Sequence, residues 1–236
     1  METQIVVAHR GASGLAPENT LLAHQVAYEV GAHMVEIDVQ ETADGELVCI
    51  HDYDVNRTTN GTGVVADLTY REIRDLDAGR GEKIPTLAQV LDYVRGKLKI
   101  NIELKVTDVE QQVFSFVDER NMISDVMISS FLHGTLIATR SIDASISTAV
   151  LVSKIRDDMI PYVVELGANA LNPDYRTISS DLMSEAHSNN IQVFPWTVND
   201  SLKIQALLEM GVDGVITDFP DIAVKILKRI NTNLIS

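Results

Sequence analysis

The chain is poor in cysteine, in basic residues and in long apolar runs. Cys49 is the single cysteine among 236 residues, which excludes an internal disulfide and favours a reducing compartment. No apolar run is long enough to cross a bilayer. The first four residues, METQ, lack the basic and apolar regions of a secretory signal. We therefore expect a cytoplasmic protein with no stable membrane anchor.

Basic residues are outnumbered by acidic ones. The sequence has 19 lysines and arginines against 34 aspartates and glutamates, so its net charge is −15 at pH 7. Nucleic acids and anionic membranes bind basic surfaces, and we therefore expect no nucleic-acid partner. A small anionic substrate is still compatible with this composition, because a few cations can dominate one pocket. No pattern in the sequence indicates an oligomeric state.

Short β-rich runs alternate with longer amphipathic segments along the chain. The expected strands are residues 5–9, 34–40, 98–105, 125–131, 147–153, 170–172, 192–198 and 214–217, and the expected helices are residues 20–30, 86–95, 109–120, 135–141, 159–166, 180–188, 201–210 and 221–230. Strict alternation predicts a parallel sheet with helical crossovers, in the α/β class. Eight units over this length favour a closed (β/α)8 TIM barrel. A doubly wound open sheet is the alternative, but its GxGxxG turn after the first strand is missing.

One segment interrupts this alternation. Residues 52–81, which follow a short extended piece at 47–50, are rich in Asn, Thr, Gly and Asp and contain at most a short helix near 69–76. We expect a single catalytic barrel domain over residues 1–236, with residues 52–81 as a small insertion after the second strand.

The first strand ends in a titratable ring and a fixed cation. Active sites of (β/α)8 barrels lie at the carboxyl ends of the strands. His9 and Arg10 stand at such an end, and His51 ends the extended piece after the second strand. Imidazole titrates near neutral pH and suits general acid–base catalysis, whereas Arg10 offers a fixed charge to an anionic group. A glycine-containing loop follows, and Asn19 or Thr20 is expected to cap the next helix.

Two further strands carry acidic residues on one face. Glu36 and Asp38 point the same way because alternate strand residues share a face, and Glu103 and Lys105 do the same on the next barrel strand. Carboxylates buried together are costly unless they are paired or coordinate a metal. Hard oxygen ligands without a nearby cysteine favour Mg²⁺ or Ca²⁺ over zinc. The set suggests metal-assisted attack on a phosphate ester.

Structural roles compete with these functional ones. Glu103 and Lys105 would satisfy each other if they only formed an ion pair. Other polar or aromatic residues are assigned as follows: His24, His33 and His187 to structural positions, His133 to the neighbourhood of the pocket, Phe131 and Trp196 to the pocket wall or to contact with the organic part of a substrate, and Asp218 to the cap of the last helix.

Several motifs occur together and in a fixed order. They are HRGASGLAPENT, VEIDVQETADGELVCIHD, RTTNGTG, IPTL, NIELK, NPDY, WTVND and GVITDFP. This combination resembles the glycerophosphodiester phosphodiesterase family over nearly the whole chain. The resemblance implies a TIM-barrel enzyme that cleaves glycerophosphodiesters into sn-glycerol 3-phosphate and an alcohol. It implies catalytic histidines at His9 and His51, and divalent-metal ligands at Glu36, Asp38 and Glu103.

The resemblance also assigns supporting roles. It implies that Arg10 faces the phosphate, that Lys105 is the lysine after the third metal ligand, and that Glu18 helps to order the site. Residues 52–81 match a small family insertion that lies over the barrel mouth. The departures, Asn190 in place of a common glycine and His24 in place of an aromatic or aliphatic residue, lie outside the inferred site.

Three alternatives to a glycerophosphodiesterase stay open. Some family members cut lysophospholipids by a phospholipase D-type reaction, so the alcohol is not determined. A non-catalytic barrel that only binds glycerophosphodiesters would lack a catalytic part, and none is missing. A Schiff-base aldolase would use Lys105 as its nucleophile, but that function does not explain three converging carboxylates.

Overall fold

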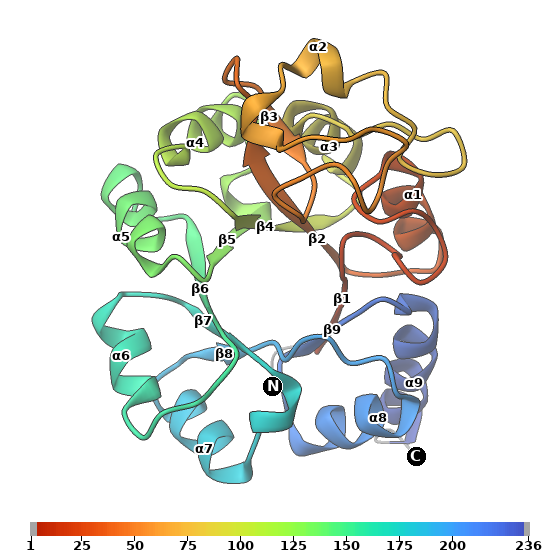
Figure 1. The fold of residues 1–236 in the computed structure, drawn as a ribbon. Helices are drawn as coiled ribbons and strands as arrows, with labels where there is room; N and C mark the ends of the chain where they lie inside the picture. The colour runs from red at the N-terminus through yellow and green to blue at the C-terminus, as the bar shows by residue number, and fades with distance from the viewer. Residues whose placement is uncertain (1–3, 234–236) are drawn as a thin grey trace.

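The computed structural model describes residues 4–233 and shows a ring of parallel strands surrounded by helices (Figure 1). The ring strands are β1 (Ile5–Ala8), β2 (Met34–Glu41), β4 (Lys99–Leu104), β5 (Val126–Ser130), β6 (Ser147–Val152), β7 (Ala170–Pro173), β8 (Gln192–Val193) and β9 (Gly214–Thr217). They pair in the order β8-β7-β6-β5-β4-β2-β1-β9, and the short strand β3 (Leu47–Cys49) pairs antiparallel with β2. The expected (β/α)8 barrel is confirmed.

Hydrogen bonds after β8 complete the ring. Ile216 donates its N–H to the carbonyl of Pro195 at 3.0 Å, and Val198 donates to the carbonyl of Ile216 at 2.9 Å. The strand expected over residues 192–198 is assigned only to Gln192–Val193. Pro195 has no N–H to give to a ladder, which limits regular pairing in this segment.

Helices lie outside the ring in Figure 1. They are α1 (Leu21–Glu29), α2 (Tyr70–Ile73), α3 (Leu87–Val94), α4 (Glu110–Asp118), α5 (His133–Ile142), α6 (Met159–Glu165), α7 (Ser180–Ser188), α8 (Ser201–Met210) and α9 (Pro220–Asn233), with single 3₁₀ turns at Val65–Asp67, Ile123–Asp125 and Tyr175–Thr177. Local capping explains where several begin. Thr86 and Gln89 form a reciprocal capping box at α3, and Asp200 caps α8.

The two faces of each strand are buried in different surroundings. Outward side chains such as Ile37, Ile100 and Ile102 are fully buried against the helices. Each of these contributes roughly 1.5–3 kcal/mol of apolar burial. A smaller apolar cluster fills the inside of the ring and consists of Val7, Met34, Met127, Ala149, Ala170, Phe194 and Ile216. Most of the inward polar residues of β2 and β4 follow this cluster along their strands, towards the carboxyl ends.

Residues 52–81 form an excursion on the β2 side of the ring. Figure 1 shows it beside β3 and α3. Val55, Val65, Ile73 and Ala78 of the excursion pack with three apolar residues from and around β3, namely Val48, Ile50 and Ile84. Arg80 donates to the carbonyl of Leu15 at 2.9 Å. The excursion is therefore attached both to β3 and to the loop after β1.

Candidate active site

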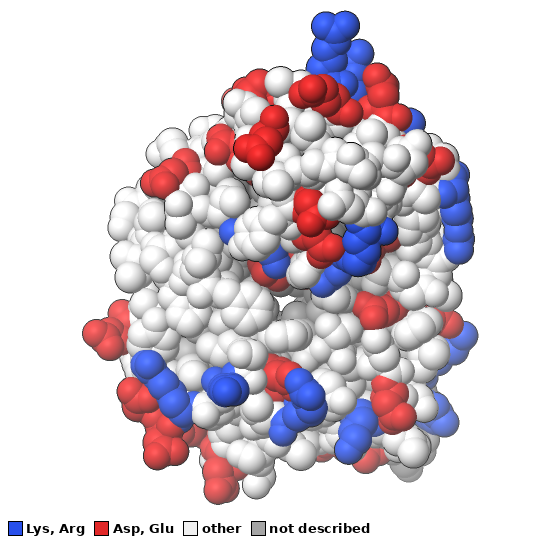
Figure 2. All heavy atoms as spheres, viewed as in Figure 1, with Lys and Arg blue, Asp and Glu red and all other residues white. Residues whose placement is uncertain are grey.

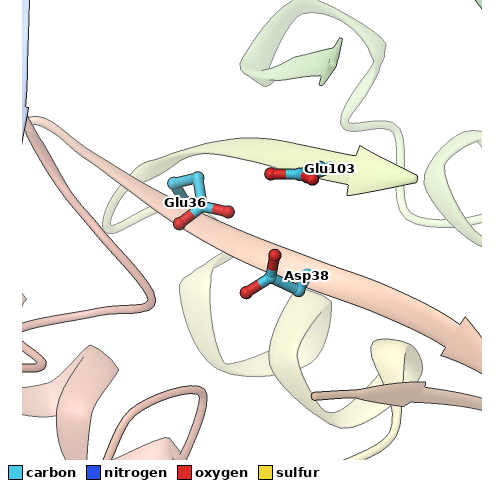
Figure 3. A group of neighbouring side chains, drawn as sticks. All are labelled: Glu36, Asp38 and Glu103. Atoms are coloured by element: carbon cyan, nitrogen blue, oxygen red, sulfur yellow. The ribbon is translucent and has the colours of Figure 1, made fainter. Parts of the chain in front are cut away.

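Three carboxylates meet at the carboxyl ends of β2 and β4. Asp38 pairs in register with Glu103 across the two strands, and Glu36 lies one inward position earlier on β2. One oxygen atom from each of the three carboxylates lies within 4.8 Å of the other two. Figure 3 shows the three groups gathered between the two strands. The side chains are nearly inaccessible, with residue exposures of 3%, 1% and 9% for Glu36, Asp38 and Glu103.

This trio has the properties of a cation site. Oε1 of Glu36 and Oδ1 of Asp38 are buried and have no hydrogen-bond partner within residues 4–233. Burial and the charge of Asp38 raise the pKa of Glu36 to about 8, and burial likewise raises the pKa of Glu103. Three hard oxygen donors, two of which have a buried oxygen atom without a partner, fit a Mg²⁺- or Ca²⁺-type ion, whose positive charge would favour the ionised carboxylates and lower these pKa values.

Two basic side chains neutralise part of the trio. Lys105 Nζ lies 2.8 Å from Glu103 Oε1 and 3.5 Å from Asp38 Oδ1, and Arg10 Nε lies 3.2 Å from Asp38 Oδ2. The simple Glu103–Lys105 pairing considered from the sequence therefore does occur. Burial lowers the pKa of Lys105, but the charges of Glu103 and Asp38 outweigh it and raise the pKa. The amine is therefore a protonated cation, which disfavours the Schiff-base alternative.

His9 is held by a carboxylate from the opposite end of the chain. Its Nδ1 lies 2.6 Å from Asp218 Oδ1, and its Nε2 lies 4.0 Å from Glu36 Oε2. Asp218 also accepts hydrogen bonds from Ser13 Oγ at 2.9 Å and Asn199 Nδ2 at 2.6 Å. Burial lowers the pKa of His9, but the hydrogen bond to Asp218 and the charge of Glu36 outweigh it and raise the pKa.

The role predicted for Asp218 is wrong. The last helix, α9, begins at Pro220, so Phe219 and not Asp218 directly precedes it. The carboxylate of Asp218 is instead occupied by the side chains of His9, Ser13 and Asn199. Burial opposes ionisation, but the hydrogen bond and charge of His9, together with the hydrogen bonds from Asn199 and Ser13, outweigh it and lower the pKa of Asp218 to about 2. Asp218 is therefore an ionised partner of His9.

His51 has a different kind of support. Its Nδ1 lies 2.7 Å from Asp52 Oδ1. Arg57, from the excursion, bonds Asp52 and also makes two 2.8 Å bonds to Glu18. Glu18 in turn accepts from Arg10 Nη1 at 2.9 Å. An unbroken chain of charged contacts thus links Arg10 to His51 through the excursion.

The loop after β1 brings its backbone close to the acids. Arg10 has a positive φ of 53° and donates its backbone N–H to Glu36 Oε2 at 2.8 Å. Asn19 also has a positive φ, of 56°, and its side-chain amide donates to Asp38 Oδ2 at 2.9 Å. Thr20, not Asn19, caps α1. A Cβ at Gly11 would lie 2.7 Å from Ala23, so this close approach requires glycine.

A pocket opens above these groups. Its lining residues are His9, Arg10, Glu36, His51, Asn101, Glu103, Ser129, Phe131, Leu151, Trp196, Thr197 and Ile216, around about 430 Å³ of empty space. The rings of Phe131 and Trp196 meet edge to face, with centroids 5.6 Å apart. Trp196 donates its indole N–H to the carbonyl of Asn172 at 2.8 Å. Figure 2 shows the hollow with charged atoms along its upper edge and uncharged atoms on its left.

A sequence model of the glycerophosphoryl diester phosphodiesterase family matches residues 9–222, a span that includes every residue of this pocket. The chain belongs to this family. It is 36% identical to a glycerophosphodiester phosphodiesterase of Caldanaerobacter subterraneus over 95% of this chain and 98% of the relative. It is 37% identical to one of Bacillus altitudinis, over 94% and 97%.

Solved structures of similar proteins share the barrel. A putative glycerophosphoryl diester phosphodiesterase of Silicibacter pomeroyi superposes with a TM-score of 0.90 at 26% identity, covering 97% of this chain and 94% of that one. A phosphodiesterase of Oleispira antarctica, solved with the product sn-glycerol 3-phosphate, gives a TM-score of 0.88 at 28% identity, covering 96% and 97%. The resemblance stated from the motifs is thereby confirmed at the level of the family.

The structure brings the ten expected site residues together. Seven of the ten line the pocket: His9, Arg10, Glu36, His51, Glu103, Phe131 and Trp196. The other three contact these residues or their neighbours: Asp38 lies beside Arg10, Glu18 binds Arg10, and Lys105 binds Glu103. His133 lies just outside the pocket lining, with its ring nitrogens on Tyr162 Oη and the carbonyl of Leu151.

The sequence alone did not identify the residues that hold the candidate site residues in place. Asp218, Asn19 and Arg57 contact a histidine, a metal-ligand candidate and two acidic residues. Asp218 stands at the carboxyl end of β9, so the strand-end rule could have identified it. Arg57 lies in a segment without regular periodicity, and nothing in its sequence context points to Glu18.

Proposed function

We propose that this chain hydrolyses glycerophosphodiesters to sn-glycerol 3-phosphate and an alcohol, in a reaction that requires a divalent cation. One observation carries the proposal: two members of the buried trio, Glu36 and Glu103, line the same pocket as two histidines that are each hydrogen-bonded to a carboxylate. The family supports it, and so does the product bound by the Oleispira antarctica phosphodiesterase.

The acidic and basic residues of the site would have different roles. Glu36, Asp38 and Glu103 would hold the cation, Mg²⁺ or Ca²⁺, whose positive charge offsets the negative charge that grows on the phosphate during reaction. Arg10 presents a guanidinium at the pocket wall, where it can contact a phosphate oxygen. Lys105 balances Glu103 and Asp38 and lowers the electrostatic cost of burying them.

Both histidines would present the same ring nitrogen to the substrate. A carboxylate accepts hydrogen bonds, so the Nδ1 atoms of His9 and His51 carry the protons that face Asp218 and Asp52. The Nε2 atoms are then the nitrogens available to a ligand in the pocket. One ring would take a proton from the nucleophile, and the other would give one to the departing alcohol. Each role is typically worth about 10²- to 10⁴-fold in rate.

The remaining expectations are consistent with this proposal. We propose that residues 1–236 act as one catalytic domain, with the excursion at 52–81 over the edge of the barrel mouth; the contacts of Arg57 with Glu18 and Asp52 support that role. Within residues 4–233, no helix is both long enough and apolar enough to span a bilayer. A cytoplasmic location and the lack of a nucleic-acid partner stay predictions.

A coupled assay tests the proposal directly. The protein, supplied with Mg²⁺ or Ca²⁺, is incubated with glycerophosphodiesters that carry different alcohols, and release of sn-glycerol 3-phosphate is followed with a dehydrogenase. We expect release from at least one diester and its loss in excess chelator. Binding of the diesters without turnover would support the non-catalytic barrel instead.

A lysophospholipid belongs in the same panel. Phe131 and Tyr53 are 44% and 62% exposed; Phe131 lines the pocket, and Tyr53 approaches the carbonyl of Lys105. An apolar rim of this kind could contact an acyl chain. Faster release of lysophosphatidic acid and free head group than of sn-glycerol 3-phosphate would favour the phospholipase D-type alternative.

A further inference from the structure

Two uncharged polar groups that line the pocket are buried without hydrogen-bond partners. They are Oδ1 of Asn101 on β4 and Oγ of Ser129 on β5, which find no hydrogen-bond partner among the residues that the structure describes. Asn101 is 2% exposed and Ser129 is 0% exposed, yet both line the pocket. A buried polar group without a partner is destabilising, because it has lost its hydrogen bonds to water and gained none in the protein. A polar ligand in the pocket would remove that cost at both positions.

Both groups are next-strand neighbours of the carboxylate trio. Asn101 pairs in register with Glu36, and Ser129 pairs in register with Glu103. Leu151 of β6 and the aromatic pair of Phe131 and Trp196 also line this pocket. The two unpartnered groups therefore lie next to the acids on neighbouring strands, in a pocket that also has an apolar wall.

We propose that Asn101 and Ser129 form a subsite for a hydroxyl group of the substrate's glycerol moiety. This inference rests on the proposed function and specifies which end of the diester is recognised. A hydroxyl can donate its single proton to Asn101 Oδ1 while its oxygen accepts a hydrogen bond from Ser129 Oγ. Phosphate-diester oxygens only accept, so they would leave Asn101 Oδ1 unpaired. The pairing of donors and acceptors thus selects an alcohol rather than the phosphate.

A third buried hydroxyl provides a matched control. Oγ1 of Thr148 on β6 is also fully buried and without a partner in the described part of the chain. Ala149 belongs to the cluster inside the ring and Leu151 lines the pocket. Because strand residues alternate, Thr148 faces the helices instead. It shares the burial of Ser129 but cannot reach a ligand in the pocket.

The test compares two ligands that differ only in hydroxyl groups. Binding of sn-glycerol 3-phosphate and of n-propyl phosphate is measured by calorimetry, in saturating Mg²⁺, for the wild type and for Ser129→Ala, Asn101→Leu and Thr148→Val. We expect the first two variants to bind sn-glycerol 3-phosphate roughly five- to twentyfold more weakly and n-propyl phosphate less than about twofold more weakly. Thr148→Val should change neither affinity.

Thermal unfolding supplies a second readout. Ser129→Ala removes a buried hydroxyl that lacks a partner, so the variant should unfold at the same temperature as the wild type or at a higher one. A group that is retained for binding and not for stability should show this combination of weaker ligand affinity and undiminished stability.

The subsite and the proposed function can fail separately. Equal weakening of both ligands by Ser129→Ala, unchanged affinity for sn-glycerol 3-phosphate, or a matching loss in Thr148→Val would overturn the subsite, even if the wild type hydrolyses glycerophosphodiesters. A wild type that hydrolyses none of them, but whose binding depends on the hydroxyls as expected, would retain the subsite and refute the proposed function.

Discussion

The two halves of the barrel mouth differ in chemistry. The first half of the chain supplies every charged side chain and both histidines that line the pocket, and one amide. These residues are His9, Arg10, Glu36, His51, Asn101 and Glu103. Those from the second half are neutral: Ser129, Phe131, Leu151, Trp196, Thr197 and Ile216. Asp218 is an exception outside the pocket lining: it comes from the second half of the chain, but its carboxylate is hydrogen-bonded to His9.

This difference indicates how the desolvation cost of a buried charged site is reduced. Charges that are buried together can pair with one another and with a cation, whereas isolated ones would each carry a full desolvation cost. Grouping them on β1, β2 and β4 leaves β5 to β8 available for neutral contacts. We infer that the charged side chains act on the phosphate and that the neutral ones, Asn101 included, contact the organic part of the substrate.

Loss of His9 or His51, the proposed proton-transfer groups, should have the largest effect on activity. His9→Ala and His51→Ala should each lower kcat by about 10²- to 10⁴-fold, because each removes one proton-transfer group. His187→Ala is the matched control, since His187 contacts Asp213 away from the pocket. Steady-state kinetics, with circular dichroism to verify folding, make the comparison. Near-full activity in either variant would remove that histidine from the mechanism.

The charged half should also make the ion-free protein sensitive to pH. The pKa of Glu36 is raised from its ordinary 4.5 to about 8 by burial and by Asp38. Between these values the folded protein keeps a proton that the unfolded chain has lost, so the free energy of unfolding decreases as pH rises. In chelator, Tm should be at least about 5 °C lower at pH 8.5 than at pH 5.5.

Two additions sharpen that measurement. Mg²⁺ should restore most of the lost Tm at pH 8.5, because the ion binds the ionised carboxylates. Glu36→Gln should weaken the dependence of Tm on pH, because glutamine has no carboxyl proton to lose. A Tm in chelator that rises or stays level over this range would contradict the assignment of a raised pKa to Glu36.

Arg57 should matter although it lies outside the pocket lining. It joins Glu18 to Asp52 and so fixes the neighbours of Arg10 and His51. Arg57→Met should lower kcat roughly tenfold, as expected when a positioned catalytic group loses its orientation. Arg57→Lys should keep more of the wild-type kcat than Arg57→Met but not all of it, because an ammonium cannot reproduce paired guanidinium contacts. Arg80→Met, which removes another arginine of the excursion, is the control. A similar loss in both Met variants would indicate a general effect of loosening the excursion.

The smallest effect is expected in the neutral half. Trp196→Leu removes the edge-to-face contact with Phe131 and part of the pocket wall. KM should rise about three- to tenfold while kcat changes by less than about threefold, because the ring contributes binding that is the same in the ground and transition states. A fall in kcat as large as that of the histidine variants would erase the distinction between the two halves.

Much of the charged half could be predicted from local pattern. The alternation in β2 and β4 placed Glu36, Asp38 and Glu103 on inward faces, and the strand-end rule located His9. The partners of these groups could not be predicted in this way. Asp218 lies 209 residues from His9, and Arg57 lies 39 residues from Glu18. Such contacts depend on ring closure and on the path of an aperiodic excursion, which no local period encodes.

The unpartnered hydroxyl of Ser129 in the pocket wall could not be predicted from the sequence either. Strand alternation places Ser129 and Ser130 on opposite faces of β5, but it does not tell which hydroxyl has a partner. Ser130 donates to the carbonyl of Leu104 at 2.7 Å, whereas Ser129 Oγ has no partner among the described residues. Only the three-dimensional arrangement distinguishes a serine that completes the backbone hydrogen bonding from one that is available to a ligand.

Calorimetric titration of the metal-free protein with Mg²⁺ or Ca²⁺ tests the central claim most directly. We expect one ion per chain for the wild type. Asp38→Asn should bind the ion at least about a hundredfold more weakly, because it loses the charge of one of the three ligands, and it should no longer hydrolyse the substrate. A wild type that binds no ion, or that hydrolyses its substrate fully in chelator with metal shown to be absent, would contradict the claim.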